Sequence, residues 1–117
     1  MRRLVIDDLR IMRFPARYAR TSAAAIEALA DPAGYDEVWF DHDLGGDDTT
    51  RPVALWLEEQ AFHGRGVAIG RCVVHTDNPV GRDVLRDQLT RVCDDVVVVA
   101  ARDHLASVID ETSGEET

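Results

Sequence analysis

The sequence of 117 residues contains no lysine, and all 13 of its basic residues are arginines. This absence excludes every site that requires an ammonium group, such as a Schiff base or the phosphate-binding lysine of a P-loop. Twenty-two acidic residues outnumber the arginines and give a formal net charge of −9. Because positive charge dominates the recognition of a phosphate backbone, the sequence argues against binding to long nucleic acids.

The sequence also lacks long apolar runs and has few cysteines. No apolar run approaches the roughly 20 residues of a membrane-spanning helix. Asp7 and Asp8 follow the first apolar residues too closely for a signal peptide. Cys72 and Cys93 are not in a CxxC arrangement and lie beside apolar runs, which is typical of reduced core thiols. We therefore expect a cytoplasmic protein without a membrane partner.

Short, continuous apolar segments recur along the chain. Segments of this kind are typical of strands that are buried on both faces of a parallel sheet. A shorter strand also fits at Arg17–Arg20. The four main segments are LVIDD from Leu4, VWFDHDL from Val38, RCVVHT from Arg71 and VVVVA from Val96.

Helical patterns lie between and after these strands, with apolar residues at helical spacing. Strands that alternate with helices predict an α/β domain with a parallel sheet. The four predicted helices are SAAAIEALA with a cap at Thr21 or Ser22, a segment from about Arg51 or Pro52 to Gly64, a segment from near Gly81 with Val84, Leu85 and Leu89 on one face, and a segment from near Arg102 with Leu105, Val108 and Ile109 facing inward.

The connection between the first strand and the short strand at Arg17–Arg20 has only about eight residues. A parallel crossover usually takes about a dozen or more residues and contains a helix. We therefore expect the first helix to be reduced or missing. No second domain is visible, so residues 1–110 are predicted to form one domain and residues 111–117 an acidic, disordered tail.

Polar residues gather at the predicted carboxyl ends of three strands. Ligands of open α/β sheets bind outside these ends. Buried acids cost several kcal/mol unless they are paired or bind a metal, so packing alone does not explain them. The alternative is that each polar residue only caps the helix or turn that follows. The residues are Asp7 and Asp8 after the first strand, Asp41, His42 and Asp43 after an inner strand, and His75, Thr76 and Asn78 after the next.

These residue types suit phosphate chemistry. Asp7, Asp8 and Asp41 offer hard oxygen ligands of the kind that Mg²⁺ prefers. His42 and His75 follow strands that should be adjacent, so we expect their imidazoles to approach each other. Two histidines in one pocket can act as general acid and general base, as phosphodiester cleavage often requires.

The acid pair Asp7–Asp8, together with Asp41 and Thr76, resembles the response-regulator receiver domain. In that family an acid pair and an acceptor aspartate hold Mg²⁺, and a serine or threonine contacts the phosphoryl group. The usual lysine after the last strand has no counterpart here, although Arg102 lies nearby in the sequence.

A closer resemblance is to the cyclic-phosphate processing receiver domain. Three motifs match in order, namely VIDDLR at Val5–Arg10, FDHDLGGDD at Phe40–Asp48 and VHTDNPVG at Val74–Gly81. Thr76 replaces the usual serine and keeps the hydroxyl, and the resemblance spans roughly residues 3 to 100. It implies a three-layer α/β sandwich of the receiver or flavodoxin-like type, with a parallel five-stranded sheet in the order 2-1-3-4-5 and a reduced or missing first helix.

The resemblance also implies a function, the hydrolysis or recognition of cyclic phosphates. The ligand would be a small cyclic phosphate or a nucleotide, and the enzyme would be a metal-assisted phosphodiesterase. In this scheme Asp7, Asp8 and Asp41 hold Mg²⁺ or another divalent cation, His42 and His75 share proton transfers, Asp43 fixes a histidine tautomer, and Thr76, Asn78 and Arg10 contact the phosphate.

Side-chain alternation along strands adds a geometric expectation. If Asp41 and Thr76 face the phosphoryl site, His42 and His75 should face the other side of the sheet, where loss of the first helix would uncover both. Two alternatives stay open. One is a non-catalytic module that binds a ligand or a protein partner, and the other is a phospho-accepting receiver with Asp41 as acceptor.

Overall fold

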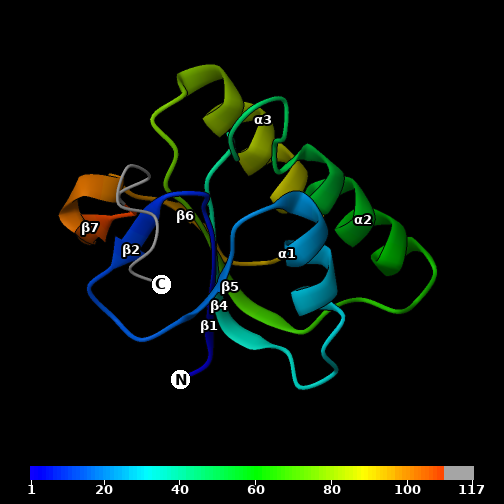
Figure 1. Ribbon diagram of the computed structural model, residues 1–117. Helices are drawn as coiled ribbons and strands as arrows, with labels where there is room; N and C mark the ends of the chain where they lie inside the picture. Colours follow the sequence, from blue (N-terminus) through cyan, green and yellow to red (C-terminus); the bar gives the residue numbers. More distant parts are fainter. Residues whose placement is uncertain (110–117) are drawn as a thin grey trace.

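The computed structural model describes residues 1–109, and a five-stranded parallel sheet forms its centre (Figure 1). Numbered by their place along the chain within this sheet, the strands have the order 2-1-3-4-5, which confirms the predicted receiver-like sheet. The expected tail at 111–117 lies outside the described residues. Across the sheet the strands are β3 (Arg17–Ala19), β1 (Arg3–Ile6), β4 (Tyr35–Phe40), β5 (Ile69–Val74) and β6 (Val96–Val98).

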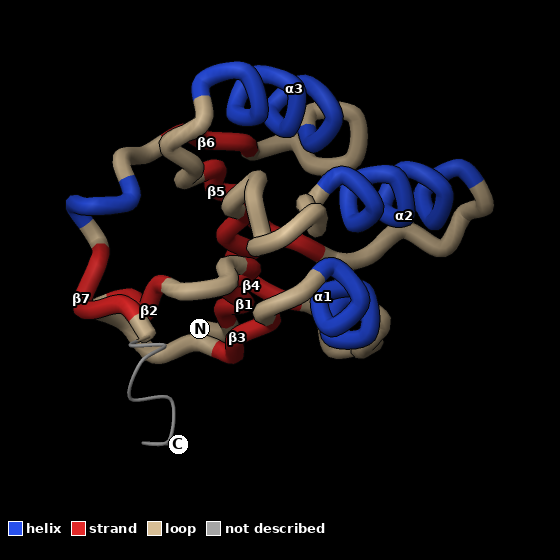
Figure 2. Tube along the Cα trace, turned by 45° about the horizontal axis from the view of Figure 1, so that its top comes forward, coloured by secondary structure: helices blue, strands red, loops and turns tan. Residues whose placement is uncertain are grey.

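Three helices, α1 (Ser22–Leu29), α2 (Arg51–Phe62) and α3 (Pro79–Leu89), cover one face of the sheet (Figure 2). They connect β3 to β4, β4 to β5 and β5 to β6, so all three crossovers move across the sheet in one direction. Right-handed crossovers in one direction place their helices on the same face. The larger hydrophobic cluster, which includes the buried Leu4 and Phe40, lies between the sheet and these helices.

The opposite face is covered by an antiparallel pair of strands, β2 (Arg10–Met12) and β7 (Leu105–Val108). The step from β1 to β3 crosses the sheet in the reverse direction, so a right-handed connection must pass over this face. That connection contains β2 and no helix, which confirms the expectation of a missing first helix. We call the pair of strands the β2–β7 ribbon.

A smaller hydrophobic cluster lies under the β2–β7 ribbon. Its buried members include Val5, Met12, Trp39 and Val73, one from each of four strands. The ring of Trp39 meets the ring of His104 edge-on, with 5.0 Å between centroids. The ribbon therefore covers this face of the sheet, as a helix does in a three-layer sandwich.

The predicted fourth helix, from near Arg102, is wrong. Only Ala101–Asp103 form a helical turn, the 3-10 helix η1, and the chain then enters β7. Val108 was expected to face inward but is 55% exposed. Within residues 1–109, β7 is the one strand that pairs with β2, so pairing with a distant segment overrides the local helical spacing.

Local signals explain where the helices that frame the site begin. The side chain of Thr21 accepts a hydrogen bond from the Ala24 amide and caps α1. The side chain of Asn78 caps α3 in the same way, and Pro79 follows in the first turn. No helix within residues 1–109 is long and apolar enough to cross a bilayer.

Candidate functional site

The carboxyl ends of β1, β4 and β5 lie side by side in register. The Asp41 amide donates a hydrogen bond to the Ile6 carbonyl at 3.0 Å, and the His75 amide donates to the Phe40 carbonyl at 3.0 Å. Asp7, Asp41 and His75, each the first residue after its strand, are therefore neighbours across this edge of the sheet. Side-chain alternation directs all three toward the face that the β2–β7 ribbon covers.

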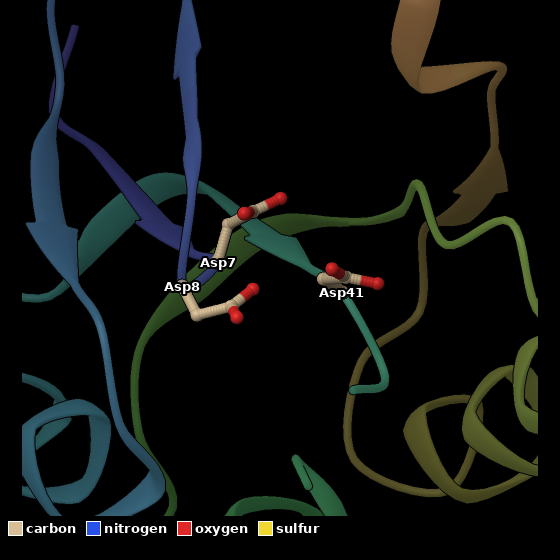
Figure 3. A group of neighbouring side chains, drawn as sticks. All are labelled: Asp7, Asp8 and Asp41. Carbon is tan, nitrogen blue, oxygen red and sulfur yellow. The ribbon is translucent and has the colours of Figure 1, made fainter. Parts of the chain in front are cut away.

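Three carboxylates form a cluster that could hold a cation (Figure 3). One oxygen each from Asp7, Asp8 and Asp41 can be chosen so that all three lie within 4.8 Å of one another. Asp7 and Asp41 are buried, and Asp8 is half-buried. A set of carboxylate oxygens fits Mg²⁺, which is usually bound through one or two carboxylates and keeps several waters.

The two buried carboxylates differ in acidity. Burial opposes ionisation of Asp7, but hydrogen bonds from His75 and from the Arg10 and Leu9 amides outweigh it and hold its pKa well below the usual range. Burial raises the pKa of Asp41, and the neighbouring charge of Asp7 raises it further, against smaller opposing effects. A positive charge nearby would therefore favour the ionised form of Asp41.

Arg10 supplies positive charge to the cluster. Its Nη1 donates hydrogen bonds to Asp7 Oδ2 at 3.2 Å and to Asp41 Oδ2 at 3.1 Å. Its Nη2 donates to Asp77 Oδ2 at 2.7 Å. Burial lowers the pKa of Arg10, but the three carboxylates more than offset this and raise it. The guanidinium therefore ties together three segments of the chain that are distant in sequence.

These residues open into a cavity of about 400 Å³ at the carboxyl edge of the sheet. Among the described residues that line it, Arg10 is the one basic side chain. Leu9 and Val108 supply apolar wall, so the cavity can accept a ligand with both charged and apolar parts. The polar lining residues are Asp7, Asp8, Arg10, Asp41, Asp43, Thr76, Asp77 and Asn78.

His75 is fully buried and does not line this cavity. Its Nε2 donates to Asp7 Oδ2 at 2.9 Å, and its ring centroid lies 5.9 Å from that of Trp39. Its Nδ1 has no hydrogen-bond partner within the described chain. When the ring proton is on Nε2, Nδ1 carries no hydrogen, so no buried donor of the ring is left without an acceptor. The environment of His75 is that of a side chain that orients Asp7.

His42 lies against the helical face instead. A Cβ on Gly81 would come within 2.5 Å of its Cγ, so the ring packs on the first turn of α3. Its Nδ1 is 3.1 Å from Asp43 Oδ1, and Asp43 lines the cavity. His42 itself is half-buried and is absent from the lining.

The expectation that His42 and His75 meet on one uncovered side is therefore wrong. The register of β4 and β5 places Asp41 opposite His75 and not opposite Thr76, so Asp41 and His75 point to the same face of the sheet. His42, the residue after Asp41, therefore points to the face opposite to that of His75. The β2–β7 ribbon also covers the face that the missing helix was expected to leave open. Their catalytic roles stay predictions, but they cannot act as one pair in this arrangement.

The loop after β5 brings the predicted phosphate-contacting residues together. The Thr76 hydroxyl is hydrogen-bonded to the carboxylate of Asp41, and Thr76 Oγ1 accepts from the Asn78 amide at 3.2 Å. Asn78 Oδ1 accepts from the Gly81 amide at 3.0 Å, and its Nδ2 donates to Asp43 Oδ2 at 3.3 Å. The structure therefore gathers Arg10, Thr76 and Asn78 at the cavity, where the proposed roles of all three are open to test.

Four lining residues were not among the predicted site residues, namely Leu9, Gly45, Asp77 and Val108. Asp77 lies within the matched motif HTDNP, and its acidic side chain beside an expected phosphate site was a usable signal. Val108 had no such signal, because its segment was expected to be helical. Arg102 is exposed in η1 and does not line the cavity.

Together, the sheet order and the acidic cluster at its carboxyl edge define a receiver-like α/β domain. The family model of the cyclic-phosphate processing receiver domain matches residues 2–91, and the chain therefore belongs to this family. The match covers β1 to α3 and hence every site residue that the sequence predicted, but not Val108. Searches of curated proteins and of solved structures found no match.

Proposed function

We propose that this protein binds a small cyclic phosphate, such as a cyclic nucleotide, with the help of a divalent cation and hydrolyses it. One observation carries the proposal: cation ligands and hydrogen-bond donors for a phosphate share a single cavity. Asp7, Asp8 and Asp41 form the ligand cluster, while Arg10 and Asn78 offer donors beside it. Membership in a family described as processing cyclic phosphates points in the same direction.

The charge of the cavity supports the need for a cation. Five carboxylates and one guanidinium are among its described lining residues, so a phosphate alone would meet strong repulsion. A divalent ion such as Mg²⁺ on the carboxylate cluster would neutralise charge on the phosphate and polarise its bond to oxygen. The chain's residues then have to hold that phosphate in place.

Arg10, Thr76 and Asn78 are the proposed phosphate contacts. A guanidinium can donate two parallel hydrogen bonds to phosphate oxygens, which fixes orientation as well as affinity. The Thr76 hydroxyl and the Asn78 side chain lie at the same wall of the cavity as Asp41. Cyclic diesters carry two unesterified oxygens, and each can accept more than one hydrogen bond, so the two oxygens can accept from all of these donors.

We assign proton transfer to His42 together with Asp43. A proton on Nδ1 that is held by Asp43 leaves Nε2 able to accept a proton from water. In the reaction, Nε2 takes one proton from the water, the water oxygen forms a bond to phosphorus, one ring P–O bond breaks, and His42 passes the proton to the departing alkoxide. The product is an open phosphate monoester. His75 acts through Asp7 as a positioning residue.

Phosphorus NMR of a panel of 2′,3′-cyclic nucleotides tests the proposal, with Mg²⁺, Mn²⁺ or a chelator present. We expect cation-dependent appearance of monoester that is lost in Asp41→Asn and reduced in His42→Ala. Asp83→Asn, which removes an exposed carboxylate on α3, is the matched control and should keep full turnover. Turnover that survives the chelator or Asp41→Asn contradicts the proposal.

A second candidate, a non-catalytic cyclic-phosphate-binding module, is favoured by one observation: neither histidine lines the cavity. In that case a cyclic nucleotide with Mg²⁺ would raise the melting temperature without forming monoester. His42→Ala would then leave the ligand-induced shift unchanged, whereas Asp41→Asn would abolish it. The same samples therefore separate the two functions.

A further inference from the structure

Arg10 contacts the same carboxylates that would bind the cation. Its Nη1 lies 3.2 Å from Asp7 Oδ2 and 3.1 Å from Asp41 Oδ2, and both residues belong to the ligand cluster. Its Nη2 is held 2.7 Å from Asp77 Oδ2 on the loop after β5. A cation that binds Asp7 and Asp41 must therefore compete with the hydrogen bonds of this guanidinium.

The backbone of Arg10 is fixed, while its side chain is long. The Arg10 amide donates to Asp7 Oδ1 at 2.8 Å, and the Arg10 carbonyl accepts from Arg20 Nη1 at 2.8 Å. Strand β2 continues from this residue and pairs with β7. Rotation about the side-chain bonds alone can thus move the guanidinium within the cavity, without a change of the fold.

We propose that Arg10 is an internal counter-ion, which the divalent cation displaces from Asp7 and Asp41 and which then binds the phosphate of the ligand. The inference rests on the proposed function, because it requires the cation cluster. An arginine stays protonated in proteins, so displacement leaves its positive charge within the cavity, with Asp77 as its remaining carboxylate partner. This freed charge raises the affinity for an anion. The cation and the phosphate consequently bind cooperatively, and by linkage each raises the affinity of the other by the same factor.

A purely structural role for Arg10 makes a different prediction. If the guanidinium only ties three segments together, its removal weakens the cation cluster and lowers cation affinity. If it competes with the cation, removal of its charge raises cation affinity and at the same time removes the contribution of Arg10 to phosphate binding. The sign of the change in cation affinity therefore separates the two roles.

Isothermal titration of the full chain with Mn²⁺ alone measures this sign. Arg10→Gln, which is of similar length but neutral, should bind Mn²⁺ about tenfold more tightly than the unaltered protein, within the usual range of coupling between sites. Arg82→Gln removes a charge of the same sign from the first turns of α3 and controls for long-range electrostatics. It should change Mn²⁺ affinity much less than Arg10→Gln does.

A second titration repeats the measurement with inorganic phosphate present. Phosphate should raise the Mn²⁺ affinity of the unaltered protein several-fold, and this gain should shrink in Arg10→Gln. Arg10→Lys keeps the charge but loses the planar, two-pronged guanidinium. Its Mn²⁺ affinity, and the gain in that affinity with phosphate, should therefore lie between the values for the unaltered protein and for Arg10→Gln. This variant also keeps the test available if Arg10→Gln does not fold.

The outcomes distinguish this inference from the proposed function. Equal or weaker Mn²⁺ binding by Arg10→Gln, with binding still abolished by Asp41→Asn, overturns the counter-ion role and leaves the cation site standing. Absence of Mn²⁺ binding in the unaltered protein and in both Arg10 variants overturns the cation site itself, and the counter-ion role with it.

Discussion

The buried pair of His75 and Asp7 allows the sharpest prediction about how the site is built. Both side chains are excluded from solvent, and His75 Nε2 donates to Asp7 Oδ2 at 2.9 Å. Removal of the imidazole with His75→Ala takes one of four hydrogen bonds from the Asp7 carboxylate and leaves a cavity beside Trp39. The fold should lose stability, and Asp7 should lose its fixed orientation.

The expected magnitude follows from these contacts. A hydrogen bond to a charged group contributes about 1.5–3 kcal/mol, and truncation of a buried ring adds a cavity cost. We therefore expect His75→Ala to lower the free energy of unfolding by about 3 kcal/mol or more. In combination with Asp7→Asn, the two changes should be non-additive by about 1–2 kcal/mol, because each removes part of the same interaction.

Urea unfolding of the two single variants and the double variant, with a chelator present, measures this coupling. His63→Ala, at an exposed position after α2, is the matched control and should change stability by no more than about 0.5 kcal/mol. If His75→Ala costs as little as His63→Ala, or if the cycle shows no coupling, the positioning role of His75 is refuted.

Three further predictions concern the site and the core. Burial and the charge of Asp7 raise the pKa of Asp41, so Asp41→Asn should raise the melting temperature in chelator and abolish the gain that Mg²⁺ gives the unaltered protein. Gly81→Ala should cost about 1–3 kcal/mol in urea unfolding, because its Cβ would lie 2.5 Å from His42 Cγ. Burial raises the pKa of the Cys72 thiol, so iodoacetamide should leave it unmodified by mass spectrometry until the chain is unfolded. The first prediction is contradicted if Asp41→Asn melts below the unaltered protein in chelator. The second is contradicted if Gly81→Ala unfolds at the same urea concentration as the unaltered protein, and the third if Cys72 is rapidly alkylated in the native protein.

The sheet and its acidic edge could be predicted because they depend on local patterns. Short apolar runs mark parallel strands, and such strands all end at one edge. Asp7, Asp8 and Asp41 directly follow their strands, so their convergence needed no knowledge of side-chain geometry. The stretch between β1 and β3 is likewise shorter than a usual parallel crossover, which predicted a reduced or missing helix.

What could not be predicted depends on register and on distant pairing. Whether His75 lies beside Asp41 or on the opposite face is decided by how β4 and β5 align, which residue types do not reveal. The antiparallel pairing of β7 with β2 joins residues about 95 positions apart and overrides a helical pattern around Val108. The reach of Arg10 to Asp41 is likewise a contact between distant segments.

The proposed function requires that a divalent cation and a cyclic phosphate occupy one cavity. Paramagnetic relaxation of the phosphorus signal of a 2′,3′-cyclic nucleotide by Mn²⁺ tests it most directly, with Asp41→Asn as the paired sample. If the two ligands share the cavity, relaxation should increase with added protein beyond the effect of free Mn²⁺, and no such increase should occur with Asp41→Asn. Relaxation that does not depend on the protein, or that persists fully in Asp41→Asn, would contradict it.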